Sequence, residues 1–423
     1  MKYYKILFIL LTPLTVLTGC KNENSDKNQI AEAELPSSPY IVDIEAIDYA
    51  FKMQSEVKSG WVTFDFENRG HKMHFGMLLK FNKPIDKKDL DRYYEDRTDE
   101  NFQKLMGEEG LTIVGGPGFH TQGQRSEMSI YLEPGDYLMS CGTETVDGTP
   151  HYELGMEKFF KVTGENSESK EPAADLEVFL TKYIIEAKGE LREGKQTIAV
   201  NHAGGDLFDV HLVKLNDTSR IESAIKFMDK VQSPSKVIFE TGVEQSKKGS
   251  VSYISLDLEP GNYAWVSHEY GAMGMVKEFS IPEGGVSEKF TQSNRDPLHI
   301  DIELAGDNIR LPSVIEAGPA TFTLKDKNSG EEHNLMMFRM EEGNTAEDFV
   351  KFSKEQKKAL EEKNEDFDME NPTSGDYVSF DESDGNLELN LDPGTYGIAC
   401  LHQDDDGNFE HLFEGEIARL EVK

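Results

Sequence analysis

Short segments in which apolar and polar residues alternate, or in which apolar residues run together, recur along the whole chain. They are rich in aromatic and β-branched residues and are bounded by glycine, proline and asparagine, which favours β-strands. In the first third of the chain we predict strands at Tyr40–Gln54, Trp61–Glu67, His74–Phe81, Glu127–Leu132, Asp136–Cys141 and Glu157–Val162. A polar stretch, Asp86–Met106, carries spaced apolar residues and predicts one or two short helices capped by Asp86.

The same order of elements follows twice more. The second set of strands is predicted at Leu176–Ala187, Gly194–Val200, His211–Leu215, Val251–Leu258, Asn262–Ser267 and Val276–Ile281, with a helix near Arg220–Val231. The third set begins at Leu298 and continues with Thr321–Leu324, His333–Met340, Leu387–Leu391, Thr395–Cys400 and Ile417–Val422, with a helix at Ala346–Lys363. Strands dominate each set, so we predict an all-β protein of antiparallel β-sandwiches, each with a short helical insertion.

One motif marks the repeat. The pattern Leu-x-Pro-Gly-x-Tyr occurs at Leu132–Tyr137, Leu258–Tyr263 and Leu391–Tyr396. Four residues after each tyrosine lie Cys141, Ser267 and Cys400. Because 423 residues exceed what one core usually holds, the repeat predicts three domains. We place them at 39–164, 175–292 and 297–423, call them modules 1, 2 and 3, and take Gly164–Asp175 and Gln292–Pro297 as linkers.

The amino terminus predicts export. Lys2 and Lys5 precede an apolar run that is too short for a permanent membrane span, which is typical of a signal peptide over residues 1–19. The sequence Leu17-Thr18-Gly19-Cys20 resembles the lipobox of bacterial lipoproteins, which implies cleavage before Cys20 and its acylation. Residues 20–38 are polar and predict a disordered tether. By this resemblance we expect a lipid-anchored protein of the bacterial cell envelope, at the outer membrane.

The charge argues against one class of partner. The chain has 44 lysine and arginine residues against 79 aspartate and glutamate residues, a net charge of -35. Such acidity repels phosphate backbones, so we expect no nucleic-acid binding.

Module 1 carries an ordered series of soft and nitrogen donors. His74 lies upstream, and Cys141, His151 and Met156 follow the Pro-Gly turn. A thiolate, two imidazoles and a weak thioether are the donors of a mononuclear copper site. His71 is the competing choice for the first imidazole, but it lies in a predicted turn. Each donor taken alone also fits ordinary packing, because free cysteine and methionine are common in cores.

These residues resemble the cupredoxins, the Greek-key sandwiches of blue copper proteins. Asn68-x5-His74 resembles the family's asparagine and first histidine, and Cys141-x9-His151-x4-Met156 resembles its ligand loop. The nine-residue gap is longer than in the small electron carriers and resembles that of copper nitrite reductases. The resemblance implies copper bound by His74, Cys141, His151 and Met156, and three tandem Greek-key domains.

The other two modules vary the donors. Module 2 has His211 and Met275, but Ser267 stands at the cysteine position and Tyr270 at the second histidine position, so we expect no blue copper there. Module 3 keeps a thiol and two imidazoles, with a carboxylate in place of the thioether. Its weaker candidate site is His333, Cys400, His411 and Glu416, with His402 as a substitute.

Two functions remain open. The first is a copper protein that carries electrons or holds copper, with an unidentified redox or protein partner. The second is a metal-free envelope scaffold in which three sandwiches present loops to a partner. We find no nucleophile and base in combination and no glycine-rich phosphate loop, and we therefore expect that the chain is not an enzyme.

Overall fold

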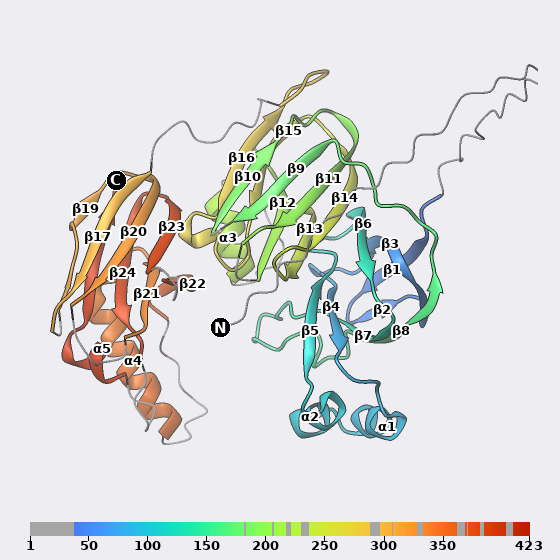
Figure 1. Cartoon of the computed structure of the whole chain (residues 1–423), viewed down its shortest axis with the longest axis horizontal. Helices are drawn as coiled ribbons and strands as arrows, with labels where there is room; N and C mark the ends of the chain where they lie inside the picture. Colours follow the sequence, from blue (N-terminus) through green and yellow to red (C-terminus); the bar gives the residue numbers. More distant parts are fainter. Residues whose placement is uncertain are drawn as a thin grey trace, which may run out of the picture. The chain divides into compact units, whose positions relative to one another are not determined.

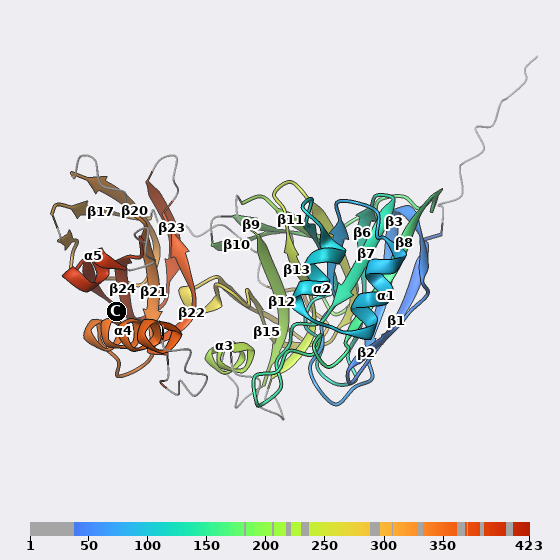
Figure 2. The same cartoon turned by 90° about the horizontal axis from the view of Figure 1, so that it is seen from below.

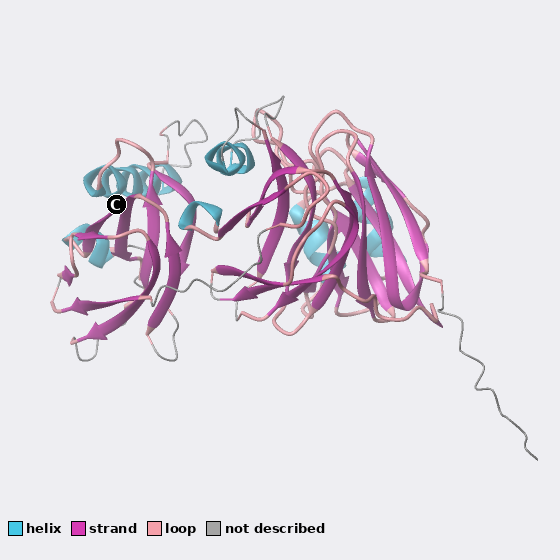
Figure 3. Cartoon of the chain, turned by 90° about the horizontal axis from the view of Figure 1, so that it is seen from above, coloured by secondary structure: helices cyan, strands magenta, loops and turns pink. Residues whose placement is uncertain are grey.

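The structure is a computed structural model that describes residues 38–423 apart from 182, 205–206, 217–220, 230–236, 288–296, 307, 328–332, 362–368, 370, 381–384 and 403–408. Strands account for most of the regular structure (Figure 3). Cys20, the rest of the predicted signal peptide and most of the tether lie outside the described residues. Among the described residues, no helix combines the length and the apolar character needed to cross a membrane.

Two sheets enclose the core of module 1 (Figure 1). Its strands are β1 (Ile41–Ile47), β2 (Ala50–Lys52), β3 (Glu56–Asn68), β4 (Met77–Phe81), β5 (Leu111–Gly115), β6 (Arg125–Leu132), β7 (Gly135–Ser140) and β8 (Glu157–Asn166). One sheet has the order β2-β1-β3-β6, and the other has the order β3-β8-β7-β4-β5. Alternate residues of β1, namely Val42, Ile44 and Ala46, are buried against this core.

β3 takes part in both sheets of module 1. Its first residues, from Glu56 to Ser59, pair with β8, whereas the residues from Gly60 to Glu67 pair with β6. The strand changes sheets at Gly60, whose φ of 95° is accessible to glycine at little cost. This transfer closes one edge of the sandwich.

The prediction of purely antiparallel sandwiches is wrong in one respect. The first strand of each module runs parallel to a neighbour: β1 to β3, β9 to β11 and β17 to β20. β8 also pairs in parallel with the start of β3. The hydrophobic pattern shows which side chains face the core, but it does not show which strand lies next to it or in which direction that strand runs.

Modules 2 and 3 repeat this design. Module 2 has the strands β9 (Leu176–Thr181), β10 (Ile184–Lys188), β11 (Gly194–His202), β12 (Phe208–Leu215), β13 (Ile238–Ser246), β14 (Val251–Leu258), β15 (Gly261–Val266) and β16 (Val276–Ile281), with the short 3-10 helix η1 (Gly271–Met273). Module 3 has the strands β17 (Leu298–Leu304), β18 (Ile309–Arg310), β19 (Val314–Ile315), β20 (Gly318–Asp326), β21 (Leu335–Met340), β22 (Thr373–Ser379), β23 (Asn386–Leu391), β24 (Gly394–Cys400) and β25 (Ile417–Val422). The sheets of module 3 have the orders β18-β17-β20-β23 and β19-β25-β24-β21-β22.

The predicted helical insertions are present. They are α1 (Lys87–Glu95), α2 (Asp99–Met106), α3 (Ile221–Asp229) and α4 (Ala346–Glu361), and an unpredicted short helix, α5 (Glu410–Glu414), precedes β25. Asp86 caps α1 by accepting a hydrogen bond from the backbone N–H of Lys88. α1 and α2 lie beside β7 and β8 (Figure 2), where Tyr93 and Leu105 pack against Phe81, Leu138 and Phe159.

Both sheets of module 1 continue into module 2. β6 pairs with β14, and β5 meets β13 at Val114 and Ser246. Neither β5 nor β13 was predicted from the sequence, and Gly115–Gly118 was assigned to no strand or helix. In the structure this segment lies against module 2, because the N–H of Gly118 donates to the carbonyl of Gly242 at 2.9 Å. A Cβ on Gly242 would lie 2.4 Å from Nδ1 of His211, so the contact requires glycine.

The repeated Leu-x-Pro-Gly-x-Tyr motif serves one structural purpose in all three modules. The buried hydroxyls of Tyr137, Tyr263 and Tyr396 donate to the carbonyls of Glu133, Glu259 and Asp392 at 2.8, 2.8 and 2.9 Å. Each tyrosine thus ties its own turn to the strand that leads to position 141, 267 or 400.

Tyr137→Phe tests this tie. Removing the hydroxyl leaves the Glu133 carbonyl without that donor, and we expect the free energy of unfolding to fall by about 1 kcal/mol. The matched control is Tyr131→Phe, because Tyr131 is 54% exposed. Melting curves of the two variants and the wild type measure the difference, and equal losses would contradict a role for the turn.

Candidate metal centre

The ligand loop of module 1 is held at both ends by its own backbone. Cys141 directly follows β7, and Met156 directly precedes β8. The N–H of Cys141 donates to the carbonyl of Met156 at 3.2 Å, and the N–H of Met156 donates to the carbonyl of His151 at 2.9 Å. These bonds bring three predicted donor residues of one loop close together.

A second loop supplies His74. Asn68 holds this loop by donating from Nδ2 to the carbonyls of Lys72 and His120 at 2.7 Å each, and its Oδ1 accepts from the N–H of Gly70. His74 and His120 also exchange two backbone hydrogen bonds. Asn68 therefore fixes the loop that carries His74.

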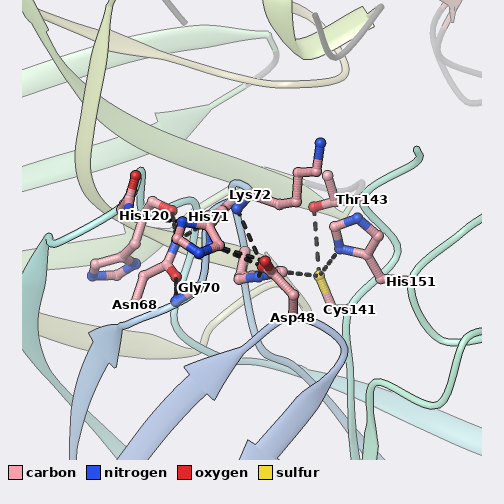
Figure 4. Close-up of polar contacts among 11 residues, drawn as sticks. Asp48, Asn68, Gly70, His71, Lys72, His120, Cys141, Thr143 and His151 are labelled. Carbon is pink, nitrogen blue, oxygen red and sulfur yellow. Dashed lines mark hydrogen bonds and ion pairs between the residues drawn. The ribbon is translucent and has the colours of Figure 1, made fainter. Parts of the chain in front are cut away.

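The donor atoms of module 1 converge on a buried point. Sγ of Cys141 lies 3.9 Å from Nδ1 of His74 and 3.6 Å from Nδ1 of His151 (Figure 4). All three side chains are at most 1% exposed. Sulfur and nitrogen atoms that bind one ion at about 2.3 Å and about 2.0 Å lie about 3.5 to 3.7 Å apart in tetrahedral or trigonal geometry. The three residues therefore fit a common metal ion after a shift of a few tenths of an ångström.

Asp48, in the turn between β1 and β2, orients His74. Its Oδ1 lies 2.8 Å from Nε2 of His74, and the carboxylate also accepts from the N–H groups of His71 and Lys72. Burial raises the pKa of Asp48, but the N–H of His71 and the side chain of His74 outweigh it, so this pKa lies below its usual value. Because an ionised carboxylate only accepts, Nε2 carries the proton of His74 and the lone pair of Nδ1 faces Cys141.

Burial keeps both imidazoles in their ligand form. It lowers the pKa of His74 and lowers the pKa of His151 to about 4. Burial also raises the pKa of the Cys141 thiol to about 11, and this thiol donates to the hydroxyl oxygen of Thr143 at 3.4 Å. Both imidazoles are therefore neutral at neutral pH. The thiol becomes a thiolate when a bound cation displaces its proton.

Of the two candidate histidines of the first loop, the structure places His74 beside Cys141. His71 is exposed, and its Nδ1 accepts from Nε2 of Gln122 at 3.1 Å, whereas His74 faces Cys141. Met156 is fully buried beside Cys141 through its backbone. The sequence analysis missed Asp48 and Thr143. Asp48 lies 26 residues before His74 and resembles any turn aspartate, so only the fold reveals its partner.

Module 2 has the same backbone with different side chains. The N–H of Ser267 donates to the carbonyl of Met275 at 3.1 Å, as Cys141 does to Met156. The sheet register places Phe208 where module 1 has His74, so the expectation that His211 is the equivalent imidazole is wrong. The ring centroids of Phe208 and Tyr270 lie 5.6 Å apart, which is similar to the 5.0 Å between the ring centroids of His74 and His151 in module 1.

His211 instead links the first two modules. Its Nδ1 accepts from the N–H of Phe119 at 3.1 Å, and its Nε2 donates to Asp209 at 2.7 Å. Asp209 also accepts from the hydroxyl of Ser267 at 2.6 Å and from the N–H of His268 at 2.8 Å. Ser267 therefore bonds to the carboxylate and not to the imidazole, so the group is a structural network rather than a catalytic triad.

Module 3 brings its four predicted donors together. His333, Cys400, His411 and Glu416 each offer one ligand atom, and these atoms lie within 4.8 Å of one another. His402 lies farther out, with its ring 5.9 Å from the ring of His411, and is not part of the group.

Comparisons with known proteins give distant structural neighbours. No family model matches the chain, and a search of curated proteins gives no match. Solved structures similar to it include a copper-containing nitrite reductase from Thermus scotoductus SA-01, at 11% identity and a TM-score of 0.19, covering 91% of this chain and 98% of that one. A multicopper oxidase from Pediococcus acidilactici has 8% identity, a TM-score of 0.17 and coverages of 92% and 89%. Auracyanin A, a blue copper protein from Chloroflexus aurantiacus, has 20% identity, a TM-score of 0.20 and coverages of 30% and 100%.

These neighbours are cupredoxin-fold proteins. The predicted all-β fold class is supported by the strands of the structure itself. They also correct one prediction. The nitrite reductase and the multicopper oxidase are enzymes, so the expectation that this chain is not an enzyme is withdrawn. At these TM-scores none of the neighbours assigns an activity to the chain.

The Asp209 network predicts a dependence of stability on pH. Burial opposes the charge of Asp209, but hydrogen bonds from His211 and Ser267 outweigh it and lower its pKa to about 2, against 3.8 for an ordinary aspartate. The ionised form therefore adds about 2 kcal/mol above pH 4, and this contribution is lost as the pH falls towards 2. We expect Asp209→Asn to be less stable than the wild type at pH 7 by about this amount, with the gap shrinking below pH 4. A gap that stays constant in urea titrations from pH 7 to pH 3 would contradict the assignment.

Proposed function

We propose that the chain is a copper protein of the bacterial cell envelope, with one mononuclear copper site in module 1. The observation that carries this proposal is the convergence of Sγ of Cys141 with Nδ1 of His74 and Nδ1 of His151. Copper bound there would supply one-electron chemistry by alternating between its two oxidation states. Met156, buried beside Cys141, is the candidate for the weak axial donor.

The residues around the donors favour a rigid site. Asp48 and Asn68 fix the loop of His74, and backbone hydrogen bonds fix Cys141 and His151. A site that barely rearranges suits both oxidation states of copper, because little reorganisation accompanies the loss or gain of an electron. We therefore propose electron transfer as the role of module 1.

The surface of the ligand loop supports exchange with a protein partner. Val146, Tyr152 and Leu154 are 83%, 38% and 45% exposed, and all three lie on the loop between Cys141 and Met156. Exposed apolar side chains beside a buried redox site suit a transient protein contact. They are less suited to a site that only stores copper.

A metal-free scaffold is the second candidate, and module 2 is the observation that favours it. There the same backbone holds Ser267, Phe208 and Tyr270, which offer no set of copper donors. Module 2 hence has a structural role, and the test of module 1 decides whether the whole chain does.

We further propose that the chain is anchored through lipid on Cys20, most simply in the outer membrane. The support is the sequence Leu17-Thr18-Gly19-Cys20 after an apolar run. The acidic surface, with its net charge of -35, favours neither nucleic acid nor direct contact with anionic lipid.

Colour tests the copper site. We expect the purified protein with one equivalent of cupric ion to show an intense visible thiolate-to-copper band, and Cys141→Ser to lose the component of that band that Cys400→Ser keeps. Cys400→Ser is the matched control, because it makes the same change in module 3 and leaves the module 1 band. A colourless wild type that takes up as much copper as Cys141→Ser would eliminate the proposal and favour the scaffold.

Asp48→Asn tests the orientation of His74. The amide loses the charge that holds the Nε2 proton, and we expect copper affinity to fall about 10- to 100-fold. Asp147→Asn is the control, because Asp147 lies on the ligand loop but bonds only to Thr145 and Thr149. Competition with a chelator of known affinity measures both variants. Equal affinities for the Asp48 variant and the control would show that Asp48 does not support the site.

Cys20→Ala tests the anchor. Without the acylated thiol the variant should leave the membrane fraction for the soluble fraction, since no described helix can replace the anchor. Cell fractionation with an antibody to the chain measures this. Continued membrane association of Cys20→Ala would contradict lipidation.

A further inference from the structure

Module 3 holds a four-donor group that differs in charge from that of module 1. Cys400 ends β24, His333 lies two residues before β21, His411 lies in α5, and Glu416 lies between α5 and β25. Sγ of Cys400 lies 3.8 Å from Nδ1 of His333 and 3.4 Å from Nδ1 of His411. Four separate segments of module 3 thus direct a sulfur, two nitrogens and a carboxylate to one point.

Glu416 is the feature that calls for a ligand. Its side chain is 2% exposed, and its Oε2 accepts no hydrogen bond from the part of the chain that the structure describes. That oxygen nevertheless lies 3.3 Å from Nδ1 of His333 and 3.4 Å from Nδ1 of His411. A buried carboxylate oxygen without a donor is costly, and a cation among the four atoms would remove that cost.

The spacing of the atoms fits one tetrahedral ion. With bonds of about 2.3 Å to sulfur and about 2.0 Å to nitrogen and oxygen, a tetrahedral ion separates sulfur from nitrogen by about 3.5 Å and nitrogen from oxygen by about 3.3 Å. The two sulfur–nitrogen distances lie within about 0.3 Å of that value, and the two nitrogen–oxygen distances lie within about 0.1 Å. Little movement is needed to bind.

The donor set selects the charge of the ion. In module 3 a thiolate and a carboxylate together carry two negative charges. In module 1 the donors His74, Cys141, His151 and Met156 carry one negative charge, that of the Cys141 thiolate. Two charges match a divalent ion, and a carboxylate is a harder donor than a thioether, so it disfavours monovalent copper. The thiolate and imidazoles in turn disfavour calcium and magnesium, which prefer oxygen.

We propose that module 3 binds a divalent transition-metal ion, zinc or cupric copper, through His333, Cys400, His411 and Glu416, and keeps it in the divalent state. This site does not depend on copper in module 1. It would give the chain a fixed metal centre in module 3 as well as a redox-active one in module 1, with Glu416 as the residue that distinguishes the two kinds of site.

The test uses the full mature chain and zinc as the probe. After the addition of excess Zn²⁺ and dialysis, elemental analysis should find one tightly held zinc ion that survives in Cys141→Ser and is lost in Cys400→Ser. Glu416→Gln, which is close in shape but uncharged, should bind zinc at least tenfold more weakly. Circular dichroism without metal checks that each variant folds.

A reciprocal exchange sharpens the test. Glu416→Met gives module 3 the donors of module 1, and Met156→Glu does the opposite. In the Cys141→Ser background, Glu416→Met should shift the preference of the module 3 site from zinc towards monovalent copper. In the Cys400→Ser background, Met156→Glu should shift the preference of the module 1 site towards zinc. Cupric ion replaces zinc in a parallel titration, and either ion held by the four residues supports the site.

The outcomes are distinct from those for module 1. No retained divalent ion in the wild type would overturn the inference and leave His333, His411 and Glu416 as an ion-paired cluster. Zinc retention unchanged by both Cys400→Ser and Glu416→Gln would overturn it as well. A failure of module 1 would appear separately, as the absence of the visible band that depends on Cys141.

Discussion

The structure depends on a short backbone clamp that occurs once in each module. The residue four positions after the tyrosine of the repeated motif donates its N–H to the carbonyl of the residue before the last strand. The pairs are Cys141 to Met156, Ser267 to Met275 and Cys400 to Glu416. The last member of each pair donates back to position 151, 270 or 411. The clamp therefore brings three side chains of one loop together through backbone hydrogen bonds alone. The hydrogen bond of the tyrosine hydroxyl fixes the strand that leads to the clamp.

A fixed backbone lets the side chains diverge. Module 1 has sulfur and two imidazoles over a buried methionine, module 2 has a serine with two aromatic rings, and module 3 has sulfur, two imidazoles and a carboxylate. In module 2 the lost donors are replaced by ring packing and by the Asp209 network, which joins it to module 1. The donor groups of modules 1 and 3 and the Asp209 network of module 2 thus share one position of the repeated fold, which is occupied by Cys141, Cys400 and Ser267.

The sequence predicted most of the strand segments, and it named the histidines and cysteines that lie together in modules 1 and 3, because strand alternation and repeated motifs are local signals. It could not show sheet neighbours, so the parallel pairs and the pairing of β5 with β13 were missed. It also assigned His211 to the position that Phe208 occupies. The residue equivalent to His74 can be identified only from the pairing register of β12 with β15, which the sequence does not give. Asp48 escaped for the same reason, since its contact with His74 spans 26 residues and a turn.

The central claim is that a single copper ion in module 1 is bound by one sulfur and two imidazoles. X-ray absorption spectroscopy at the copper edge, on copper-loaded Cys400→Ser protein, tests this directly because it counts the atoms bound to the metal. The account predicts one sulfur scatterer at short distance together with two imidazole nitrogens. A first shell made only of nitrogen and oxygen would contradict it.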